Sequence, residues 1–278
     1  MKLLGAGDNV SDRYLHLSMQ FPGGNAVNVA VFAARMGVHA GYLGVVGNDD
    51  VGRHLLSALA AEHVDVTHVR VGSGPNATAD VELRDNDRVF LRSDRTTALF
   101  DLNDEQLELM RRYDVVHSGY AGTLLARVPE IAERTKVSFD FGARFDFDQL
   151  ASSLHHLHLA SFSGGHLVER EAEDLVRAAR DAGAEHVLVT RGEAGAFVGA
   201  GDRVYHQPAD LVSPVDTLGA GDAFIAGLLV GLGTGRSMPA TLAAASAHAA
   251  QVCQVYGAFG RGMPFDPASV VEPKTAPA

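Results

Sequence analysis

The sequence has few of the features that mark secreted, nucleic-acid-binding or membrane-spanning proteins. Its one cysteine, Cys253, cannot form an internal disulfide, so no thiol framework indicates secretion. Its 23 Lys and Arg residues stand against 34 Asp and Glu residues, a net charge of -11, and form no cluster that would attract a polyanion. The longest apolar run, residues 223–232, is well short of the roughly 20 residues that a spanning helix needs. We therefore expect a cytoplasmic protein that binds neither nucleic acid nor a membrane.

Three common site signatures are missing as well. Residues 5–7 (GAG) follow a predicted strand, but Val10 stands where a dinucleotide-binding fingerprint needs its third glycine. No Gly-x-x-x-x-Gly-Lys-Ser/Thr segment occurs, which excludes a P-loop kinase by pattern. The histidines within residues 155–158 lack the spacing of a zinc site, so we expect no structural metal.

Apolar runs typical of buried strands alternate along the chain with segments of helical period. The predicted strands are residues 2–5, 41–46, 114–117, 137–141, 156–160 and 186–190. The predicted helices are residues 25–36, 51–62, 103–112, 128–134, 169–182, 222–232 and 240–255. This alternation predicts an α/β fold with a mostly parallel central sheet and helices on both faces. One domain would span residues 1–266, and an irregular tail would follow at 267–278.

Two segments, residues 8–17 and 79–92, break this alternation. In the second, apolar and polar residues alternate around a turn signal at residues 85–87 (DND), which is typical of a hairpin. Val81 would lie on one face of the ribbon and Asp80 on the other. We expect a small antiparallel appendage that covers a pocket with its polar side. An ordinary exposed hairpin is the alternative.

The most informative segment is residues 216–222 (DTLGAGD), a glycine-rich turn that runs into an apolar helix. Glycines let the backbone approach a ligand, and the N–H groups of a helix's first turn favour negative charge. We therefore expect Gly219, Ala220 and Gly221 to form an anion hole. Asp222 at its mouth would accept a proton from a substrate hydroxyl while the amides hold a transferring phosphoryl group. Alternatively, Asp222 only caps its helix.

A second glycine segment, residues 22–30 (PGGNAVNVA), also stands at the entrance of a helix. Asn25 and Asn28 are three residues apart, so their side chains share a face and offer donors and acceptors to polyol hydroxyls. With the polar residues near the N-terminus they make a set typical of sugar recognition, namely Asp8, Asn9 and Asp12. Alternatively, Asn25 caps the helix and Asn28 is solvated.

A third segment, residues 190–195 (TRGEAG), follows a predicted strand. Ligands of open α/β sheets gather at the carboxyl ends of strands, so Thr190, Gly192 and Gly195 would line a nucleotide site. A strand-to-strand turn, with glycines for its geometry, is the alternative.

Together these segments resemble the ribokinase or PfkB carbohydrate kinase family. The resemblance rests on four segments between Gly7 and Gly257, namely residues 23–28, 44–52, 190–192 and 216–222. It implies a ribokinase-like three-layer sandwich with a mostly parallel central sheet. It also implies a small β-sheet lid, inserted as two segments at about residues 8–20 and 76–100.

The resemblance also implies roles for individual residues, with ATP and Mg²⁺ as cofactors. Asp222 would be the catalytic base beside the anion hole. The sugar would be bound by polar residues and two lid residues, namely Asp8, Asp12, Gly24, Asn25, Asn28, Phe90 and Arg92. The ATP site would comprise Thr190, Gly192, Gly195, Gly221 and Ala245.

For metals, the resemblance implies a monovalent cation, K⁺, near Asp216 and Gly257. Many relatives also carry an Asn-x-x-Glu motif whose Glu helps to organise Mg²⁺ through water. This chain has residues 161–165 (SFSGG) at that place. Glu169 would be the substitute for the missing Glu.

The stretches 81–90 and 139–141 are similar to those of family members that phosphorylate fructosamines. This similarity implies transfer of the γ-phosphoryl group of ATP to the 6-hydroxyl of fructoselysine or a related fructosamine. Fructose, ribose or adenosine as the acceptor remain alternatives, as does a catalytically silent sugar-binding regulator. Lids of relatives often pair between subunits, which implies a homodimer through the lid.

Overall fold

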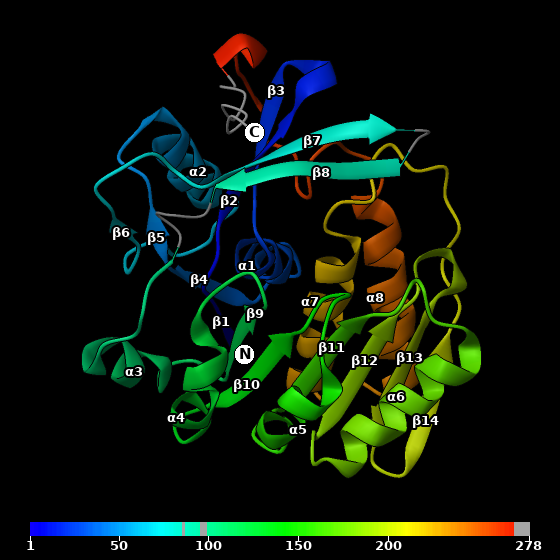
Figure 1. Ribbon diagram of the computed structural model, residues 1–278. Helices are drawn as coiled ribbons and strands as arrows, with labels where there is room; N and C mark the ends of the chain where they lie inside the picture. Colours follow the sequence, from blue (N-terminus) through cyan, green and yellow to red (C-terminus); the bar gives the residue numbers. More distant parts are fainter. Residues whose placement is uncertain (85–86, 95–98, 270–278) are drawn as a thin grey trace, which may run out of the picture.

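The computed structural model describes residues 1–84, 87–94 and 99–269, and an eight-stranded sheet runs through this described part (Figure 1). The strand order is β14-β13-β12-β11-β10-β9-β1-β4. The parallel strands are β1 (Lys2–Ala6), β4 (His39–Leu43), β9 (Val115–Gly119), β10 (Lys136–Asp140), β11 (Leu159–Ser163) and β12 (His186–Thr190). The antiparallel strands are β13 (Ala196–Ala200) and β14 (Arg203–Gln207). The mostly parallel sheet expected from the sequence is confirmed.

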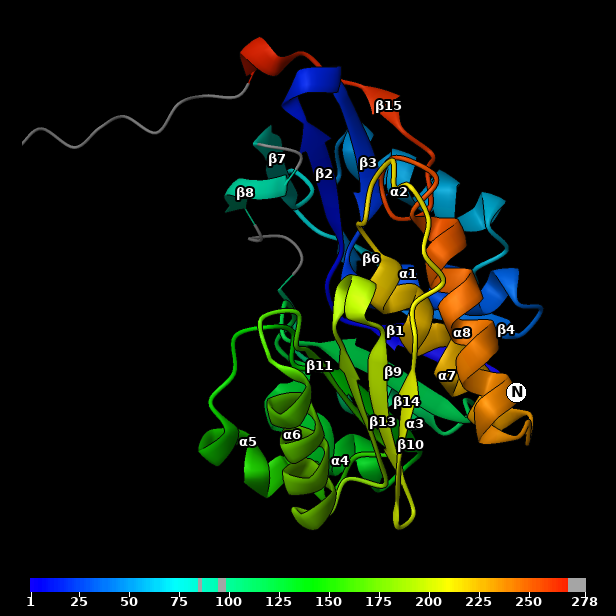
Figure 2. The ribbon, with the colours of Figure 1, turned by 90° about the vertical axis from the view of Figure 1, so that its right-hand side faces the viewer.

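Helices cover both faces of this sheet, so the main body has three layers (Figures 1 and 2). One layer holds α1 (Asn25–Arg35), α2 (Asp50–Ala61), α7 (Ala220–Gly233) and α8 (Met238–Val252). The other layer holds α3 (Asp104–Met110), α4 (Val128–Ala132), α5 (Phe147–Leu154) and α6 (Glu169–Asp181). The expected three-layer sandwich is therefore present.

Each central strand is buried on both of its faces. Leu3 packs into the core beneath α1 and α7, whereas the next residue, Leu4, packs into the core beneath α4 and α6. Val115 and Val116 of β9 divide between the two cores in the same way. Full burial of one such aliphatic side chain contributes about 1.5–3 kcal/mol. The strands are thereby fixed, and their carboxyl ends hold the following loops in place.

A second sheet, five-stranded in the described residues, lies over the carboxyl ends of the central strands as a lid (Figure 2). Its order is β15 (Met263–Pro264), β3 (Met19–Gly23), β2 (Val10–Tyr14), β7 (Thr78–Arg84) and β8 (Asp87–Asp94). The sequence-based expectation of an antiparallel appendage is wrong in one respect, because β2 and β7 pair in parallel. The later residues of β3 and the whole of β15 extend the lid beyond the two expected segments. The turn expected at residues 85–87 lies partly outside the described residues.

The lid turns its apolar face, not its polar face, toward the main body. Tyr14, Phe21 and Val81 form a small core on that face, against Leu218 and Tyr256. The expectation that the lid covers a pocket with its polar side is therefore wrong. Alternation along a strand dictates the outcome, because the polar neighbours of these residues must point to the opposite face.

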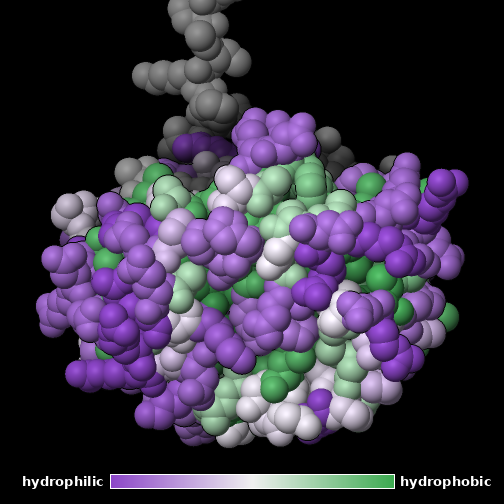
Figure 3. Space-filling model, turned by 90° about the horizontal axis from the view of Figure 1, so that it is seen from below, coloured by the Kyte–Doolittle hydropathy of each residue, from purple (hydrophilic) through white to green (hydrophobic). Residues whose placement is uncertain are grey.

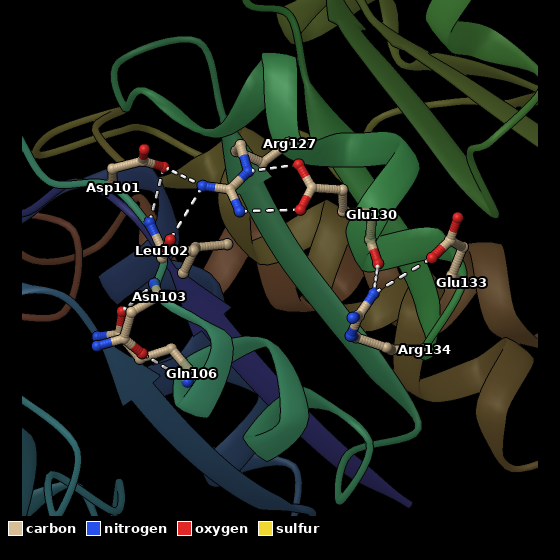
Figure 4. A network of polar contacts seen from close by, with 8 residues as sticks. All are labelled: Asp101, Leu102, Asn103, Gln106, Arg127, Glu130, Glu133 and Arg134. Atoms are coloured by element: carbon tan, nitrogen blue, oxygen red, sulfur yellow. Dashed lines mark hydrogen bonds and ion pairs between the residues drawn. The ribbon is translucent and has the colours of Figure 1, made fainter.

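A polar network fixes the chain where it returns from the lid to the main body (Figure 4). Asn103 caps α3 through the backbone N–H of Gln106, and the Gln106 side chain accepts in return from the Asn103 backbone. Arg127 donates to both carboxylate oxygens of Glu130, at 2.7 and 2.9 Å, and also contacts Asp101. These contacts hold the start of α3 against α4.

One predicted strand is displaced. The sequence predicts a strand at residues 156–160, but β11 begins three residues later, at Leu159. Helix α5 ends at Leu154, and a tight turn follows it, in which the backbone N–H of His156 donates to the carbonyl of Ser153. The strand predicted at residues 41–46 is divided between β4 and β5 (Val45–Val46), and elements without a prediction include α5, β13, β14 and β6 (Arg70–Val71), which pairs with β5.

The end of the molecule away from the lid presents a mostly hydrophilic surface (Figure 3). Throughout the described ranges, no helix combines the length and the apolar character that crossing a membrane requires.

Candidate active site

Helix α7 begins at the glycine-rich turn on which the sequence analysis centred. Gly219 precedes the helix with φ +80°, a conformation that L side chains rarely adopt. A Cβ at this residue would also lie only 2.5 Å from the Cβ of Ala258. The turn therefore requires glycine at 219, and it presents Ala220 and Gly221 of the first helical turn to an adjoining pocket.

The carboxylate of Asp222 is held by two amides from the second glycine segment. Asn25 Nδ2 donates to Oδ1 of Asp222 at 2.8 Å, and Asn28 Nδ2 donates to Oδ2 at 2.6 Å. Helices α1 and α7 share one core, which brings these residues together from opposite ends of the chain. Gly219, not Asp222, is the N-cap residue of α7. The geometry thus favours a site residue over a helix cap.

Helix α1 is capped by a distant carboxylate rather than by its own first residue. Its N-cap is Gly24, with φ +112°. The Asp8 carboxylate accepts from the backbone N–H of Asn25 at 3.0 Å and of Ala26 at 3.3 Å. A charged acceptor at a helix N-terminus complements the helix dipole. Asp8 therefore fixes where α1 begins, and the Asn25 side chain is left for other contacts.

A second carboxyl, Asp140, lies beside Asp222 and was given no role by the sequence analysis. It ends β10, is 7% exposed, and accepts from Asn25 Nδ2 at 3.0 Å and from the backbone N–H of Gly142 at 3.1 Å. Burial, followed by the negative charge of Asp222, raises its pKa to about 7. Its place at the carboxyl end of a predicted central strand was the signal that could have identified it.

Two buried polar atoms on the lid side of Asp222 have no hydrogen-bond partner within the described part of the chain. They are the amide oxygen of Asn28 and the hydroxyl of Ser118, the last residue but one of β9. Asp12 of the lid lies near the Asn28 amide, because a Cβ on Gly23 would stand 2.7 Å from Oδ2 of Asp12 and 3.7 Å from the amide oxygen of Asn28. Buried polar groups normally have partners, so unpartnered ones mark a place for a polar ligand. This side of Asp222 is suited to hydroxyl groups.

Asn9 belongs to a neighbouring structural contact. Its Nδ2 donates to the hydroxyl of Tyr42 at 3.0 Å and to the carbonyl of Val45 at 2.6 Å. Of the sequence-predicted polar set, Asn9 thus ties the loop after β1 to the segment after β4.

A pocket of about 360 Å³ lies on the other side of the α7 turn. It is lined by three residues of the predicted nucleotide segment, Thr190, Gly192 and Gly195, and by Gly221 of α7. Residues 190–195 do connect β12 to β13, as the alternative of a strand-to-strand turn predicted, but they also border the pocket. The structure thus brings residues 190–195 and residues 216–222, two of the three predicted glycine segments, to one cavity.

One predicted nucleotide-site residue faces elsewhere. Ala245 of α8 is fully buried, and its Cα lies 2.8 Å from where a Cβ of Gly227 would be. It therefore packs α8 onto α7, and its assignment to the pocket wall is wrong. Residues further round α8 line the pocket instead, namely Ser246, Ala249, Ala250 and Cys253. The loop before α7 adds Asp210, Leu211 and Val212, which the sequence analysis also missed.

The predicted cation residues, Asp216 and Gly257, are brought together. The backbone N–H of Gly257 donates to Oδ2 of Asp216 at 2.9 Å, and that of Leu218 donates to Oδ1 at 3.0 Å. The Tyr14 hydroxyl donates to the same carboxylate. Both carboxylate oxygens thus already accept hydrogen bonds that fix the turn.

Of the two lid residues predicted to contact sugar, Arg92 has a described side chain, and this side chain is not brought to Asp222. The Phe90 backbone lies in β8, opposite Val81, and its side chain lies outside the described residues. Arg92 stands opposite Asp80 in the pairing of β8 with β7, and it lines a hollow of about 310 Å³ together with Arg13. This hollow is on the lid face that points away from Tyr14 and Val81.

Glu169, the predicted substitute in the Mg²⁺ site, is also not brought to the pocket. It stands exposed in the first turn of α6. The segment that replaces the Asn-x-x-Glu motif contributes Ser163 to the pocket wall and places Ser161 Oγ 3.4 Å from Asp140 Oδ1. The carboxylates that line the pocket are those of Glu193 and Asp210.

The chain is similar to known proteins over most of its length. Residues 17–264 match the family described as pfkB family carbohydrate kinase. The chain is 39% identical over 270 residues to the fructosamine kinase FrlD of Bacillus subtilis, covering 95% of each chain. It is 38% identical over 267 residues to the fructoselysine 6-kinase of Escherichia coli, covering 93% of this chain and 100% of that one.

Solved structures give the same fold. The ribokinase of Arabidopsis thaliana, complexed with ribose and ATP, superposes with a TM-score of 0.79 at 20% identity. The match covers 97% of this chain and 96% of the ribokinase.

Proposed function

This chain belongs to the pfkB family of carbohydrate kinases, and on that basis we propose that it phosphorylates the 6-hydroxyl of fructoselysine or a related fructosamine. As a member of that family it is an ATP-dependent phosphotransferase that acts on a sugar. The single observation that best supports the proposal is the position of Asp222. Its carboxylate is held by Asn25 and Asn28 on the hydroxyl-suited side, and its neighbour Gly221 lines the nucleotide-sized pocket on the other side.

In the proposed reaction, Asp222 is the catalytic base. The sugar 6-hydroxyl gives its proton to Asp222, and its oxygen forms a bond to the γ-phosphorus of ATP while the bond between that phosphorus and the β–γ bridging oxygen breaks. ADP is the leaving group. The transition state is loose, so the reaction depends more on positioning than on a strong base. Two amide donors on one carboxylate provide that positioning.

The anion hole is proposed at the first turn of α7. The backbone N–H groups of Gly219, Ala220 and Gly221 would hold the transferred phosphoryl group, supported by the helix dipole. This placement resolves the apparent conflict between a net charge of -11 and a substrate as negative as ATP. Net charge governs long-range attraction, whereas the phosphates would be held locally by amides.

We propose ATP with Mg²⁺ as the second substrate. The pocket fits both groups, because Thr190 and Ser246 offer polar contacts, and Glu193 and Asp210 offer carboxylate oxygens of the kind Mg²⁺ accepts. Mg²⁺ would neutralise charge on the β- and γ-phosphates. A monovalent cation at Asp216 and Gly257 stays a prediction, as does a homodimer through the lid.

The charge of the acceptor side favours an amine-bearing sugar over a phosphorylated one. Asp8 and Asp12 lie there with Asp140 and Asp222, whereas Arg13, the nearest basic residue in the lid strand, faces the opposite side. Carboxylates attract the ammonium group of a fructosamine and repel the phosphate of fructose 6-phosphate. This observation sets fructosamines ahead of fructose, ribose and adenosine.

The test is ADP release from ATP with five acceptors offered in parallel: fructoselysine, fructose, ribose, fructose 6-phosphate and adenosine. We expect the highest kcat/KM with fructoselysine and no turnover of fructose 6-phosphate. Turnover of a free sugar or nucleoside alone would replace the proposed substrate. No turnover of any acceptor, combined with sugar binding in calorimetry, would favour the silent sugar-binding regulator.

A further inference from the structure

The side-chain amide of Asn25 has every hydrogen-bonding group in use. Its nitrogen donates one hydrogen to Asp222 at 2.8 Å and the other to Asp140 at 3.0 Å. Its oxygen lies 2.9 Å from Nε2 of His117. A primary amide has two donors and one acceptor atom, so no donor of Asn25 remains for a sugar hydroxyl.

His117 determines which way this amide points. The amide oxygen of Asn25 carries no hydrogen, so Nε2 of His117 must be the donor in their contact. The other ring nitrogen, Nδ1, lies 2.9 Å from Oγ of Ser138, and the Ser138 hydroxyl therefore donates to it. A neutral ring with its hydrogen on Nε2 satisfies both contacts. If the amide were reversed, its oxygen would face two carboxylates and its nitrogen would face an N–H group.

Complete burial keeps the ring in this neutral form. His117 is 0% exposed, in the middle of the sheet on β9, and burial lowers its pKa to about 3. Ser138 is equally buried on the adjacent strand β10. The two residues are thus held by the parallel sheet itself rather than by a loop.

The backbone also leaves the amide no room to move. A Cβ on Gly119, the last residue of β9, would lie 2.3 Å from the amide oxygen of Asn25. Asn25 is itself 9% exposed and begins a helix whose start Asp8 fixes. The amide fits only because residue 119 has no side chain.

We propose that His117 is a positioning residue for the phosphoryl transfer, acting through Asn25 to hold the carboxylate of Asp222. Asn25 is then a support for the base, and the sugar is bound instead by Asn28, whose buried amide oxygen has no partner in the described part of the chain. Asp140 completes the support by holding the second hydrogen of the Asn25 amide. This inference rests on the proposed kinase reaction.

The test compares two substitutions of His117. His117→Phe keeps the ring volume but removes the donor, so the Asn25 amide loses its fixed orientation. We expect kcat to fall at least about tenfold, because a hydrogen bond to a charged group contributes strongly. KM for the sugar should change less than about threefold, since Asn28 is untouched. The acid limb of the pH–rate profile should move to higher pH, because the charged form of Asp222 loses a donor; the carboxyl groups on the same side of the site are those of Asp140, Asp8 and Asp12.

His117→Gln is the conservative variant, because its terminal amide can again donate to Asn25. We expect it to recover most of the lost kcat and the original acid limb. His158→Phe is the matched control: it removes another buried histidine, which directly precedes β11 and contacts Glu185 rather than Asn25, and it should leave kcat unchanged. Unchanged kcat and pH profile in a folded His117→Phe protein would overturn the proposal, as would a His117→Gln protein no more active than His117→Phe.

A measurement on the unmodified protein separates this inference from the proposed function. Nitrogen NMR of the histidine rings reports which nitrogen carries the hydrogen, without any substrate. We expect His117 to be neutral with its hydrogen on Nε2 throughout pH 5–8, and to acquire a mixed tautomer in Ser138→Ala. A hydrogen on Nδ1 in the wild type would overturn the inference. Failure of every acceptor in the substrate panel would instead overturn the proposed function, and with it the catalytic role of His117, while the hydrogen-bond arrangement reported by NMR would stand. If His117→Phe does not fold, Ser138→Ala replaces it in the kinetic test. A kcat of Ser138→Ala equal to that of wild type would contradict the proposal.

Discussion

The hydroxyl of Tyr14 donates a hydrogen bond to the carboxylate of Asp216. Tyr14 lies in the lid and Asp216 stands directly before the glycine turn of α7, and both side chains are buried. Two further donors, the backbone N–H groups of Leu218 and Gly257, reach the same carboxylate. One side chain thus connects the lid, the proposed anion hole and the loop after α8.

This connection predicts the effect of Tyr14→Phe. The variant keeps the ring contacts but removes one donor to a buried carboxylate, so we expect the free energy of unfolding to fall by about 1.5–3 kcal/mol. The kcat/KM for ATP should fall as well, because the glycine turn is less firmly held. Urea unfolding and steady-state kinetics measure the two effects. Tyr256→Phe, in the same aromatic cluster, is the control and should have little effect on either. Equal losses in both variants would show that ring packing, not the hydroxyl, matters.

Asp222→Asn should separate binding from chemistry. The substitution retains the shape of the side chain but removes the proposed proton acceptor, so we expect kcat to fall by about 10²–10⁴-fold. Calorimetric titration should still detect sugar and nucleotide. A variant whose kcat lies within a few-fold of wild type would refute Asp222 as the base.

Asp140 and His117, which both contact Asn25, should give opposite pH dependences of the free energy of unfolding. Burial and Asp222 raise the pKa of Asp140 from 3.8 to about 7, so its contribution is fully present below about pH 4 and is lost as pH rises through 7. Burial lowers the pKa of His117 from 6.5 to about 3, so its contribution is fully present above about pH 6.5 and is lost as pH falls through 3. Between pH 4 and 6.5 the two effects oppose each other in the wild type.

Single substitutions should uncover each effect. Relative to wild type, the free energy of unfolding of Asp140→Asn should rise more steeply with pH between 4 and 6.5, by up to about 1.4 kcal/mol per pH unit. The free energy of unfolding of His117→Phe should rise less steeply with pH than that of wild type over the same range, by a similar amount. Urea unfolding at several pH values gives both slopes. Parallel curves for all three proteins would mean that neither group has the assigned protonation state.

Cys253 offers a direct probe of the nucleotide pocket. It is the one cysteine of the chain, it is 8% exposed, and it lines the pocket. We expect saturating ATP to slow its alkylation by N-ethylmaleimide at least about tenfold, because ligands in such pockets bury most of the lining. Mass spectrometry of the intact protein gives the rate. The sugar alone is the control, and protection by sugar but not by ATP would place the nucleotide elsewhere.

The two faces of the lid should differ in their effect on the sugar. Asp12 faces the site, beside Gly23, whereas Arg92 lies on the outer face with Arg13. We therefore expect Asp12→Asn to raise KM for the sugar at least about tenfold and Arg92→Ala to change it less than about threefold. Steady-state kinetics at saturating ATP decide the matter. The reverse order would mean that the lid turns its polar face inward when sugar is bound.

What the sequence could predict depended on how local the signal was. The turn at Gly219 and Gly221 was found because adjacent residues carry its whole geometry. The alternation of strands and helices was found for the same reason, since each element repeats its own period. The role of Asp222 in the reaction remains a prediction, although the surrounding geometry supports it.

Contacts between distant segments were not predictable in this way. His117 and Asp140 contact Asn25, and Ser138 contacts His117, only because β9, β10 and α1 lie side by side in the fold. Ala245 was assigned to the nucleotide site because the sequence of α8 does not show which residues face the pocket and which face α7. The packing of Ala245 against Gly227 shows that it faces α7. The face of the lid was misjudged because the alternation of a hairpin does not reveal which side meets the rest of the protein.

Helix α7 has no free face along most of its length. Every residue from Ala223 to Gly231 is buried, and the backbones at Gly227 and Gly231 lie so close to Ala245 and Thr241 that neither helix can slide along the other. Asp222, in the first turn of α7, is therefore anchored to two helices that are closely packed against each other. Divergence toward new acceptors in this fold should accumulate in the lid strands and the neighbouring loops, while the helix that carries the acid stays constant.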